Sequence, residues 1–458
     1  MPHTDPVILA HAFGGRQDLP IPFSYALTGA AAAVVVSFAA LGVLWQRSRL
    51  QGDRAGRPLP AWLQAWADGP VLRFGLPVLG LALAGFVAVA AIFGPDDALN
   101  PAVGLVYVVF WVGIVPASLL FGPVWRQLNP LRTLHRGLAR LMRTSPEEGL
   151  YPLPAWLGYW PAAGGLLAFT WVELVHPDAA STATLRTWFS AYAGVQILGA
   201  AAFGSRWFDR CDAFEVYSSF IGRLAPLGRR DDGQLVLRNP LDGLDGLPAA
   251  PGIVAVVCVM LGSTAFDGFS NSPLWIGALQ SGQSGSLTAL AMGSYALVGT
   301  VLVVAVLYVA ATGISGLLVR SDRTAERAGD RADDRAGLPR QFAHSIVPIA
   351  VGYVVAHYFS LLMFEGQHTL VLASDPLGTE ADLFGIGDRG VDYTVVTPAA
   401  IALVQVLGVV TGHVVGVVAA HDRAVRLFPR AQAVAGQLPL LVLMVCYTVG
   451  GLTLLFAA

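Results

Sequence analysis

Charged residues are scarce in this sequence, and one kind is missing altogether. Only 13% of the 458 residues are charged, against about 25% in an average soluble domain. All 28 basic residues are arginine, and the formal net charge is −2. No basic tract is long enough to follow a phosphate backbone, so we expect no nucleic-acid partner. With 55% hydrophobic residues, the composition is that of an integral membrane protein.

Several motifs are also missing. The three cysteines, Cys211, Cys258 and Cys446, are far apart and form no CxxC pair, which argues against a disulfide framework or a thiolate metal site. The sequence has no glycine-rich phosphate loop, no HExxH and no GxSxG, the motifs of common nucleotide-binding and hydrolytic sites. Before Pro20 the only apolar run covers residues 7–10, too short for a removable signal peptide. We therefore expect the first long span to direct insertion.

Long apolar runs dominate the remaining sequence. A membrane-spanning helix needs roughly 20 apolar residues, and ten runs meet that length. They predict an all-α polytopic transmembrane helix bundle in the lipid bilayer, with an N-terminal arm at residues 1–20 and one transmembrane domain at 21–458. The ten predicted spans are 21–45, 71–94, 102–121, 155–176, 184–204, 252–269, 287–319, 342–364, 395–420 and 438–456.

The arginines predict the orientation of these spans. Of the 28, 25 lie in or beside five alternate connections, at about 46–70, 122–154, 205–251, 320–341 and 421–437. Because cytoplasmic loops retain positive charge, we expect these loops inside a bacterial plasma membrane and both termini outside. Residues 132–143 have the pattern of a basic amphipathic helix at the membrane surface. The highly charged segment 320–340 is typical of a solvated linker.

Ionisable residues inside the spans are the first candidates for function, because charge is expensive in lipid. Asp267 and His357 are each fifteen residues from the inner end of their span, about 22 Å at 1.5 Å per residue. Glu173 is about 27 Å from the inner end of its span by the same rise. These depths predict that the three residues gather in the outer leaflet.

Two Glu-x-x-His tetrapeptides are expected at the same outer end of the bundle, Glu173–His176 and Glu365–His368, the second one to four residues beyond the predicted end of its span. This spacing places a carboxylate and an imidazole on one helix face and recurs in di-iron carboxylate bundles. It predicts a mono- or dinuclear site for zinc, iron, manganese or copper. The alternative is a hydrogen-bonded polar plug of Glu173, Asp267 and His357, with His176 and His368 in solvent. The predicted metal ligands are Glu173, His176, Asp267, His357, Glu365 and His368.

The N-terminal arm adds two further candidates. Arg16 and Asp18 lie in a Gly- and Pro-containing stretch on the outer side, where they are expected to cover the site and orient substrate or water. The alternative is a plain surface arm. A bis-histidine haem is disfavoured, because His344, His413 and His357 lie at about 3, 10 and 22 Å from the inner edge. His344 and His413 are then an inner polar pair.

Four segments resemble a known family. They are HAFGGRQDLPIPFSYALTGAA, FGPVWRQLNPLRTLHR, ELVHPD and FAHSIVPIAVGYVVAHYFSLLMFEGQ. The chain is similar, over nearly its whole length, to the polytopic bacterial membrane proteins of the fenitrothion hydrolase family and is identified as an actinobacterial member. The resemblance implies a membrane-bound hydrolase of organophosphate triesters with a second membrane subunit as partner. It implies no particular catalytic residues.

The residues and the resemblance are compatible. Phosphotriester hydrolysis needs an activated water and an electrophile on the phosphoryl oxygen, which metal ions supply. Small apolar triesters also partition into bilayers, where an outer-leaflet site would meet them. Two other classes stay open. One is a proton- or metal-coupled transporter that uses polar groups at two depths. The other is a non-catalytic membrane subunit of a metalloenzyme complex.

Overall fold

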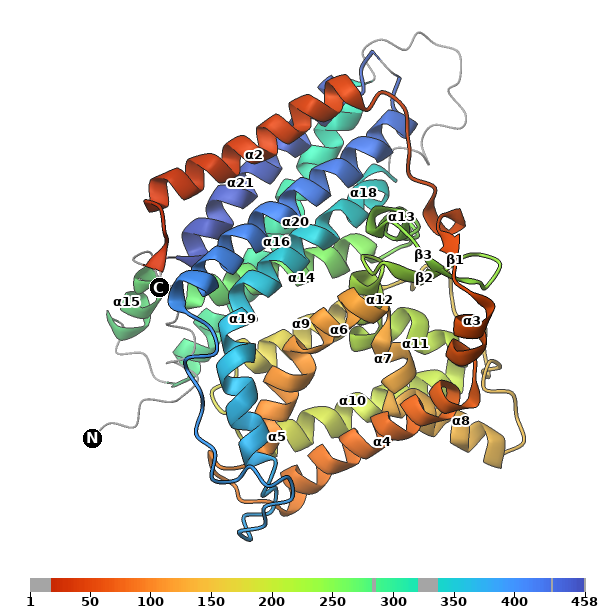
Figure 1. Cartoon of the computed structure of the whole chain (residues 1–458), viewed down its shortest axis with the longest axis vertical. Helices are drawn as coiled ribbons and strands as arrows, with labels where there is room; N and C mark the ends of the chain where they lie inside the picture. The colour runs from red at the N-terminus through yellow and green to blue at the C-terminus, as the bar shows by residue number, and fades with distance from the viewer. Residues whose placement is uncertain (1–17, 282–285, 320–336, 430, 457–458) are drawn as a thin grey trace. The chain divides into compact units, whose positions relative to one another are not determined.

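The structure, a computed structural model, describes residues 18–281, 286–319, 337–429 and 431–456. Within them nearly all regular structure is α-helical (Figure 1), which confirms the predicted all-α class. By their contacts, the described residues form two compact units. Unit 1 comprises residues 56–238 and 360–397, and unit 2 comprises residues 18–55, 239–359 and 398–456. The predicted linker at 320–340 lies almost wholly outside the described residues.

A helical segment lies at each of the ten predicted spans, and eight of these segments are long and apolar enough to cross a membrane. The other two are α9 (Trp160–Leu174) and α10 (Thr182–Phe203). Helix α9 would extend only about 22 Å at 1.5 Å per residue, and Arg186 and Gln196 interrupt the apolar sequence of α10. The chain is a multi-pass helical membrane protein. Its orientation stays a prediction.

Unit 1 surrounds a short buried helix. Nine of the ten residues of α12 are buried, and α12 packs against α6, α7 and α9. The elements of unit 1 before α19 are β1 (Arg57–Pro58), α3 (Ala61–Ala67), α4 (Pro70–Phe93), α5 (Pro101–Gly104), the π-helical segment η3 (Leu105–Val112), α6 (Ile114–Phe121), α7 (Val124–Leu128), α8 (Pro130–Leu141), α9, α10, α11 (Arg206–Cys211), α12 (Ala213–Gly222), β2 (Leu227–Arg229) and β3 (Leu235–Leu237).

The predicted cytoplasmic loops contain more regular structure than their sequences indicated. Loop 122–154 holds α7 and α8, and loop 205–251 holds α11, α12, two strands and α13 (Pro240–Asp245). The three strands form an antiparallel sheet in the order β1-β3-β2. The Asn-Pro sequence begins three of the helices, α5, α8 and α13, with Pro at the first position and the Asn side chain accepting from backbone N–H groups. Both features favour a helix start.

Unit 2 is a bundle of long helices. Helix α2 packs along α20 and α21, and α14 packs on α16 (Figure 1). Helix α19 contributes to both units, with the boundary between Phe359 and Ser360. The elements are α2 (Phe23–Leu44), η2 (Gly52–Arg54), α13, α14 (Ile253–Ser270), α15 (Pro273–Ser281), α16 (Ser286–Leu318), α18 (Leu338–Phe342), η4 (Ala343–Ile346), α19 (Val347–Leu372), α20 (Pro398–Leu427), η5 (Ala435–Gln437) and α21 (Leu438–Leu455).

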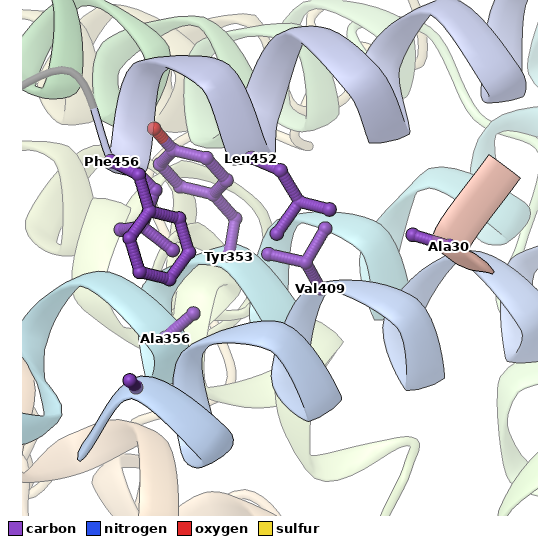
Figure 2. Close-up of a cluster of buried hydrophobic side chains, with 8 residues drawn as sticks. Ala30, Tyr353, Ala356, Val409, Leu452 and Phe456 are labelled. Carbon is purple, nitrogen blue, oxygen red and sulfur yellow. The ribbon is translucent and has the colours of Figure 1, made fainter. Parts of the chain in front are cut away.

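The core of unit 2 lies where α2, α19, α20 and α21 meet. Figure 2 shows Ala30, Tyr353, Val409, Leu452 and Phe456 converging from these helices and from the residue that follows α21. Small and large side chains interlock there, as close packing requires. Tyr353 has a second role, because the same ring borders the polar residues described below.

Candidate functional site

Three polar side chains meet between α14 and α19 in unit 2. The Oδ2 atom of Asp267 accepts a hydrogen bond of 2.6 Å from the Tyr358 hydroxyl. The Nε2 atom of His357 lies 2.9 Å from the same oxygen. The side chains of Asp267 and His357 are only 7% and 9% exposed. The predicted proximity of Asp267 and His357 is therefore confirmed, and we call Asp267, His357 and Tyr358 the polar triad.

Aromatic rings hold the triad in place. The Tyr353 ring stacks on the His357 imidazole at 6.0 Å between centroids, and the Tyr358 ring meets that imidazole edge to face at 4.8 Å. The Tyr353 hydroxyl is buried and has no hydrogen-bond partner among the described residues. It borders the triad, since a Cβ atom at Gly268 would come within 2.5 Å of it. Figure 2 shows Tyr353 beside Phe456 in the adjoining apolar core.

The Glu365–His368 pair forms on α19, in unit 1, at 3.4 Å between Oε2 and Nδ1. At the Glu173 tetrapeptide the predicted shared helix face is absent, because α9 ends at Leu174. His176 instead accepts a hydrogen bond of 3.2 Å from the Asp178 backbone N–H. Its ring lies edge to face with Trp171.

The predicted metal centre draws on both units, with Asp267 and His357 in unit 2 and its other four residues in unit 1. Among the described residues, no three His, Cys, Asp or Glu side chains are grouped so that they could hold a metal ion. The metal centre therefore stays a prediction. Asp18 is half-buried just before α2, and Arg16 lies outside the described residues.

His344 and His413, the two histidines of unit 2 that were predicted to form an inner polar pair, are both buried. The Nδ1 atom of His413 lies 2.8 Å from the Val409 carbonyl oxygen, and its Nε2 atom is buried without a hydrogen-bond partner in the described part of the chain. The Nε2 atom of His344 is in the same situation. Unit 2, which carries the triad, therefore contains two further buried histidines.

Sequence reasoning missed a buried ionic network in unit 1. Arg132, which was expected at the membrane surface, is 2% exposed. Its guanidinium donates two hydrogen bonds to Glu215, at 2.6 and 3.0 Å, and one of 2.8 Å to Asp209. Asn129, the cap of α8, donates from its side chain to both Asp212 and Glu215 at 3.1 Å. The polar face of α8 is therefore turned into the protein.

The network continues into α10. The Tyr192 hydroxyl donates to Asp212 at 3.1 Å and accepts from the Ala213 backbone N–H at 3.0 Å. Asp212 also caps α12 by accepting from the Glu215 backbone N–H at 2.8 Å. The network thus joins α8, α10, α11 and α12, and buried ionic groups are retained in this way only when their hydrogen bonds are well satisfied.

The network makes stability depend on pH. Burial, the main cause, raises the pKa of Glu215 from 4.5 to about 7, against the attraction of Arg132. Between about pH 4.5 and 7 the folded state then binds a proton that the unfolded state lacks. The stabilisation from this proton is complete below about pH 4.5 and is lost as the pH rises to about 7. The loss is up to about 3 kcal/mol. Burial also raises the pKa of Asp212, which acts in the same direction.

We expect the thermal unfolding midpoint of the purified protein to fall between pH 6.5 and pH 8, and this fall to shrink in Glu215→Gln. Tryptophan fluorescence on heating measures both. Burial lowers the pKa of His135, which gives a slope of the opposite sign below about pH 6.5, so the comparison between the two proteins is made above that pH. An equal fall in both would show that Glu215 does not titrate in this range.

No protein-family model, curated protein sequence or solved structure matches the chain. The fold and its apolar helices define the class as a multi-pass membrane protein of the all-α type. The evidence for its function is the buried polar triad.

Proposed function

We propose that the chain is a membrane-embedded hydrolase in which Asp267 and His357 activate a water molecule. The observation that carries the proposal is the 2.9 Å distance between the carboxylate and the imidazole in a buried part of two apolar helices. Ionisable groups in such helices are costly and tend to be retained for function. A carboxylate next to a histidine fixes the orientation of the ring and stabilises the cation that forms when the ring takes up a proton.

The chemistry needs little else from the protein. The Asp267–His357 pair takes a proton from water, and the water oxygen forms a bond to the electrophilic phosphorus. The bond from phosphorus to the leaving group breaks, and that group departs with the electron pair as an alkoxide or phenoxide. The proton on the Asp267–His357 pair then passes to the departing oxygen or to solvent, which restores the base. Tyr358 donates to Asp267 and so keeps the carboxylate directed at the imidazole. The stacked ring of Tyr353 restricts the imidazole to one orientation.

The substrate class comes from the family resemblance, which points to organophosphate triesters. These compounds carry no charge and partition into the hydrocarbon region, where the triad lies on apolar spans. A divalent metal at Glu173, His176, Asp267, His357, Glu365 and His368 and a second membrane subunit belong to the same proposal. No step above depends on either of them.

The test is hydrolysis by purified protein in nanodiscs. A dialkyl 4-nitrophenyl phosphate serves as probe, and released 4-nitrophenolate is followed by its absorbance. We expect Asp267→Asn and His357→Ala each to lower the rate about 100-fold or more, as the loss of a general base does. Tyr358→Phe removes one hydrogen bond to the Asp267 carboxylate. A bond to a charged group contributes about 1.5–3 kcal/mol, so the rate should fall by roughly tenfold or more, though less than in Asp267→Asn.

Leu370→Ala is the matched control, because it truncates a side chain of the same helix that is 51% exposed and belongs neither to the triad nor to the proposed metal site. Its rate should stay near that of the wild type. Size-exclusion profiles establish that every variant is folded. Hydrolysis that survives in both Asp267→Asn and His357→Ala, or a wild-type protein that hydrolyses no triester, would refute the proposed activity.

A proton-coupled carrier is the second candidate, and the buried inner histidines favour it. His344 and His413 lie in the same unit as the triad and keep buried Nε2 atoms without partners in the described residues. Polar groups at two depths suit a protein that binds a proton from either side in turn. Proteoliposomes with an imposed pH gradient separate the two functions, because a carrier acidifies or alkalises the lumen without consuming a phosphotriester.

A further inference from the structure

A hollow lies at the end of α2 where the arginine distribution predicts the cytoplasmic side. Its volume is about 470 Å³, and residues 43, 44 and 46–49 line it. Val43 and Leu44 form an apolar wall and are 71% and 72% exposed. Arg47 and Arg49, a few residues after Leu44, also line it. Apolar and cationic groups therefore share one hollow at the level where a spanning helix leaves the membrane.

The rim of the hollow is fixed by hydrogen bonds to one buried carboxylate. Asp422 accepts from the Trp45 indole N–H at 2.9 Å, from the Ser48 hydroxyl at 2.8 Å and from the Arg49 backbone N–H at 2.6 Å. Its own charge is matched by Arg426 at 3.2 Å. The turn after α2 is thus held on α20, and the hollow is preformed.

The two arginines of the hollow keep their charge unmatched. Arg49 donates to the Leu44 carbonyl at 3.0 Å and lies over the Trp45 ring at 4.6 Å. Within the described residues, neither Arg49 nor Arg47 has a carboxylate in ion-pair distance. Two cations beside exposed apolar side chains complement a ligand that is anionic at one end and apolar at the other.

We propose that this hollow binds the headgroup of an anionic phospholipid, with the phosphate on Arg47 and Arg49 and an acyl chain along Val43 and Leu44. A membrane supplies such a ligand at this level of the protein, and anionic lipids are concentrated in the cytoplasmic leaflet. Guanidinium groups bind phosphate oxygens through paired N–H donors. The site is separate from the polar triad and does not depend on the proposed hydrolase activity.

The experiment measures lipid binding to the detergent-purified full chain by native mass spectrometry and thermophoresis. Phosphatidylglycerol should bind more tightly than phosphatidylcholine. At about 1 kcal/mol per basic residue near a membrane surface, Arg47→Ala should weaken phosphatidylglycerol binding about fivefold. The double variant Arg47→Ala/Arg49→Gln should weaken it roughly 25-fold by the same arithmetic. Arg47→Ala alone keeps the test decisive if the double variant misfolds.

Two controls separate a lipid site from general charge attraction and from a site for a free phosphate ester. Arg54→Ala removes an exposed arginine nearby that does not line the hollow, and it should leave binding unchanged. Leu44→Asn should weaken phosphatidylglycerol binding without changing the binding of glycerol phosphate. Equal losses in Arg54→Ala and Arg47→Ala would mean general charge attraction and overturn the proposal. Equal affinity for phosphatidylcholine, or for glycerol phosphate and phosphatidylglycerol, would overturn the lipid headgroup as ligand.

Discussion

Replacing Arg132 with methionine should destabilise the protein by about 3–5 kcal/mol, as breaking a buried ion pair from one side does. Glu215 would lose its bidentate partner, and its carboxylate is only 1% exposed. Asp209 and Asp212 lie in the same network, so three acidic side chains would remain around an apolar group. The cost comes from buried carboxyl groups that lose their donor and must then stay charged without it or take up a proton, because methionine replaces much of the lost volume.

The matched control is Arg126→Ala. Arg126 binds the same Asp209 oxygen at 3.1 Å, but its side chain is 49% exposed, and exposed ion pairs contribute about 1 kcal/mol or less. Thermal unfolding in detergent, followed by size exclusion, compares the two variants. Arg132→Met/Glu215→Leu should recover part of the loss, since it removes both buried charges. Equal midpoints for Arg132→Met and Arg126→Ala would show that the network contributes nothing to stability.

The sequence predicted the helices well because hydrophobic length is a strong constraint in lipid. A helical segment lies at each of the ten predicted spans. Depth counting also placed Asp267 and His357 at one level, since both helices rise by the same distance per residue. It did not show that α14 and α19 are neighbours. It could not show that Tyr358 joins them, because a tyrosine within an apolar run has many roles. Nor could it show that Tyr353 stacks on the imidazole, which depends on how α19 is rotated.

The predicted loop boundaries were less accurate, because some charged residues that were assigned to loops are buried in helices. Helix α20 continues to Leu427, seven residues past the predicted end of its span. Asp422 and Arg423 carry charge, so hydropathy ends the span before them, yet both are buried and hydrogen-bonded. Arg132 was placed at the membrane surface for the same reason. Charge marks a loop only when no partner is available, and a single sequence does not state partners.

One signal for the loop structure was present in the sequence. Residues 207–222 alternate acidic residues with Trp, Phe, Tyr and Ile, an apolar content too high for a solvated loop. The division into two units had no such signal, because each unit combines segments that are far apart in the chain. The predicted metal centre requires residues from both units, and spacing along the chain cannot predict whether residues of two units meet.

A row of glycines on α20 should make the protein sensitive to a larger side chain, and this is the second large effect on stability that we expect. Gly408, Gly412 and Gly416 follow one another at intervals of four on α20. A Cβ atom at Gly412 would come within 2.5 Å of the Pro348 carbonyl oxygen, and one at Gly352 within 2.3 Å of the Gly408 carbonyl oxygen. Small residues at this spacing let two membrane helices approach closely, so α19 and α20 are in backbone contact there.

Gly412→Val should therefore separate α19 from α20, at a cost of about 1–3 kcal/mol for overpacking and more if the backbone cannot shift. The clash is with backbone atoms of a neighbouring helix, which cannot rotate away as a side chain can. Because the polar triad draws two of its three residues from α19, the same change should also lower any activity of that site. Thermal unfolding of the purified variant measures the first effect, and the nanodisc assay measures the second.

Gly299→Val on α16 is the control, because a Cβ atom there would meet nothing within 4 Å. It adds the same volume and the same β-branched side chain to a long apolar helix, so intrinsic helix propensity cancels between the two variants. A lower unfolding midpoint for Gly412→Val alone supports close contact of α19 with α20. Equal midpoints would mean that the helices can move apart without loss, and the position of His357 and Tyr358 would then depend on α14 rather than on α20.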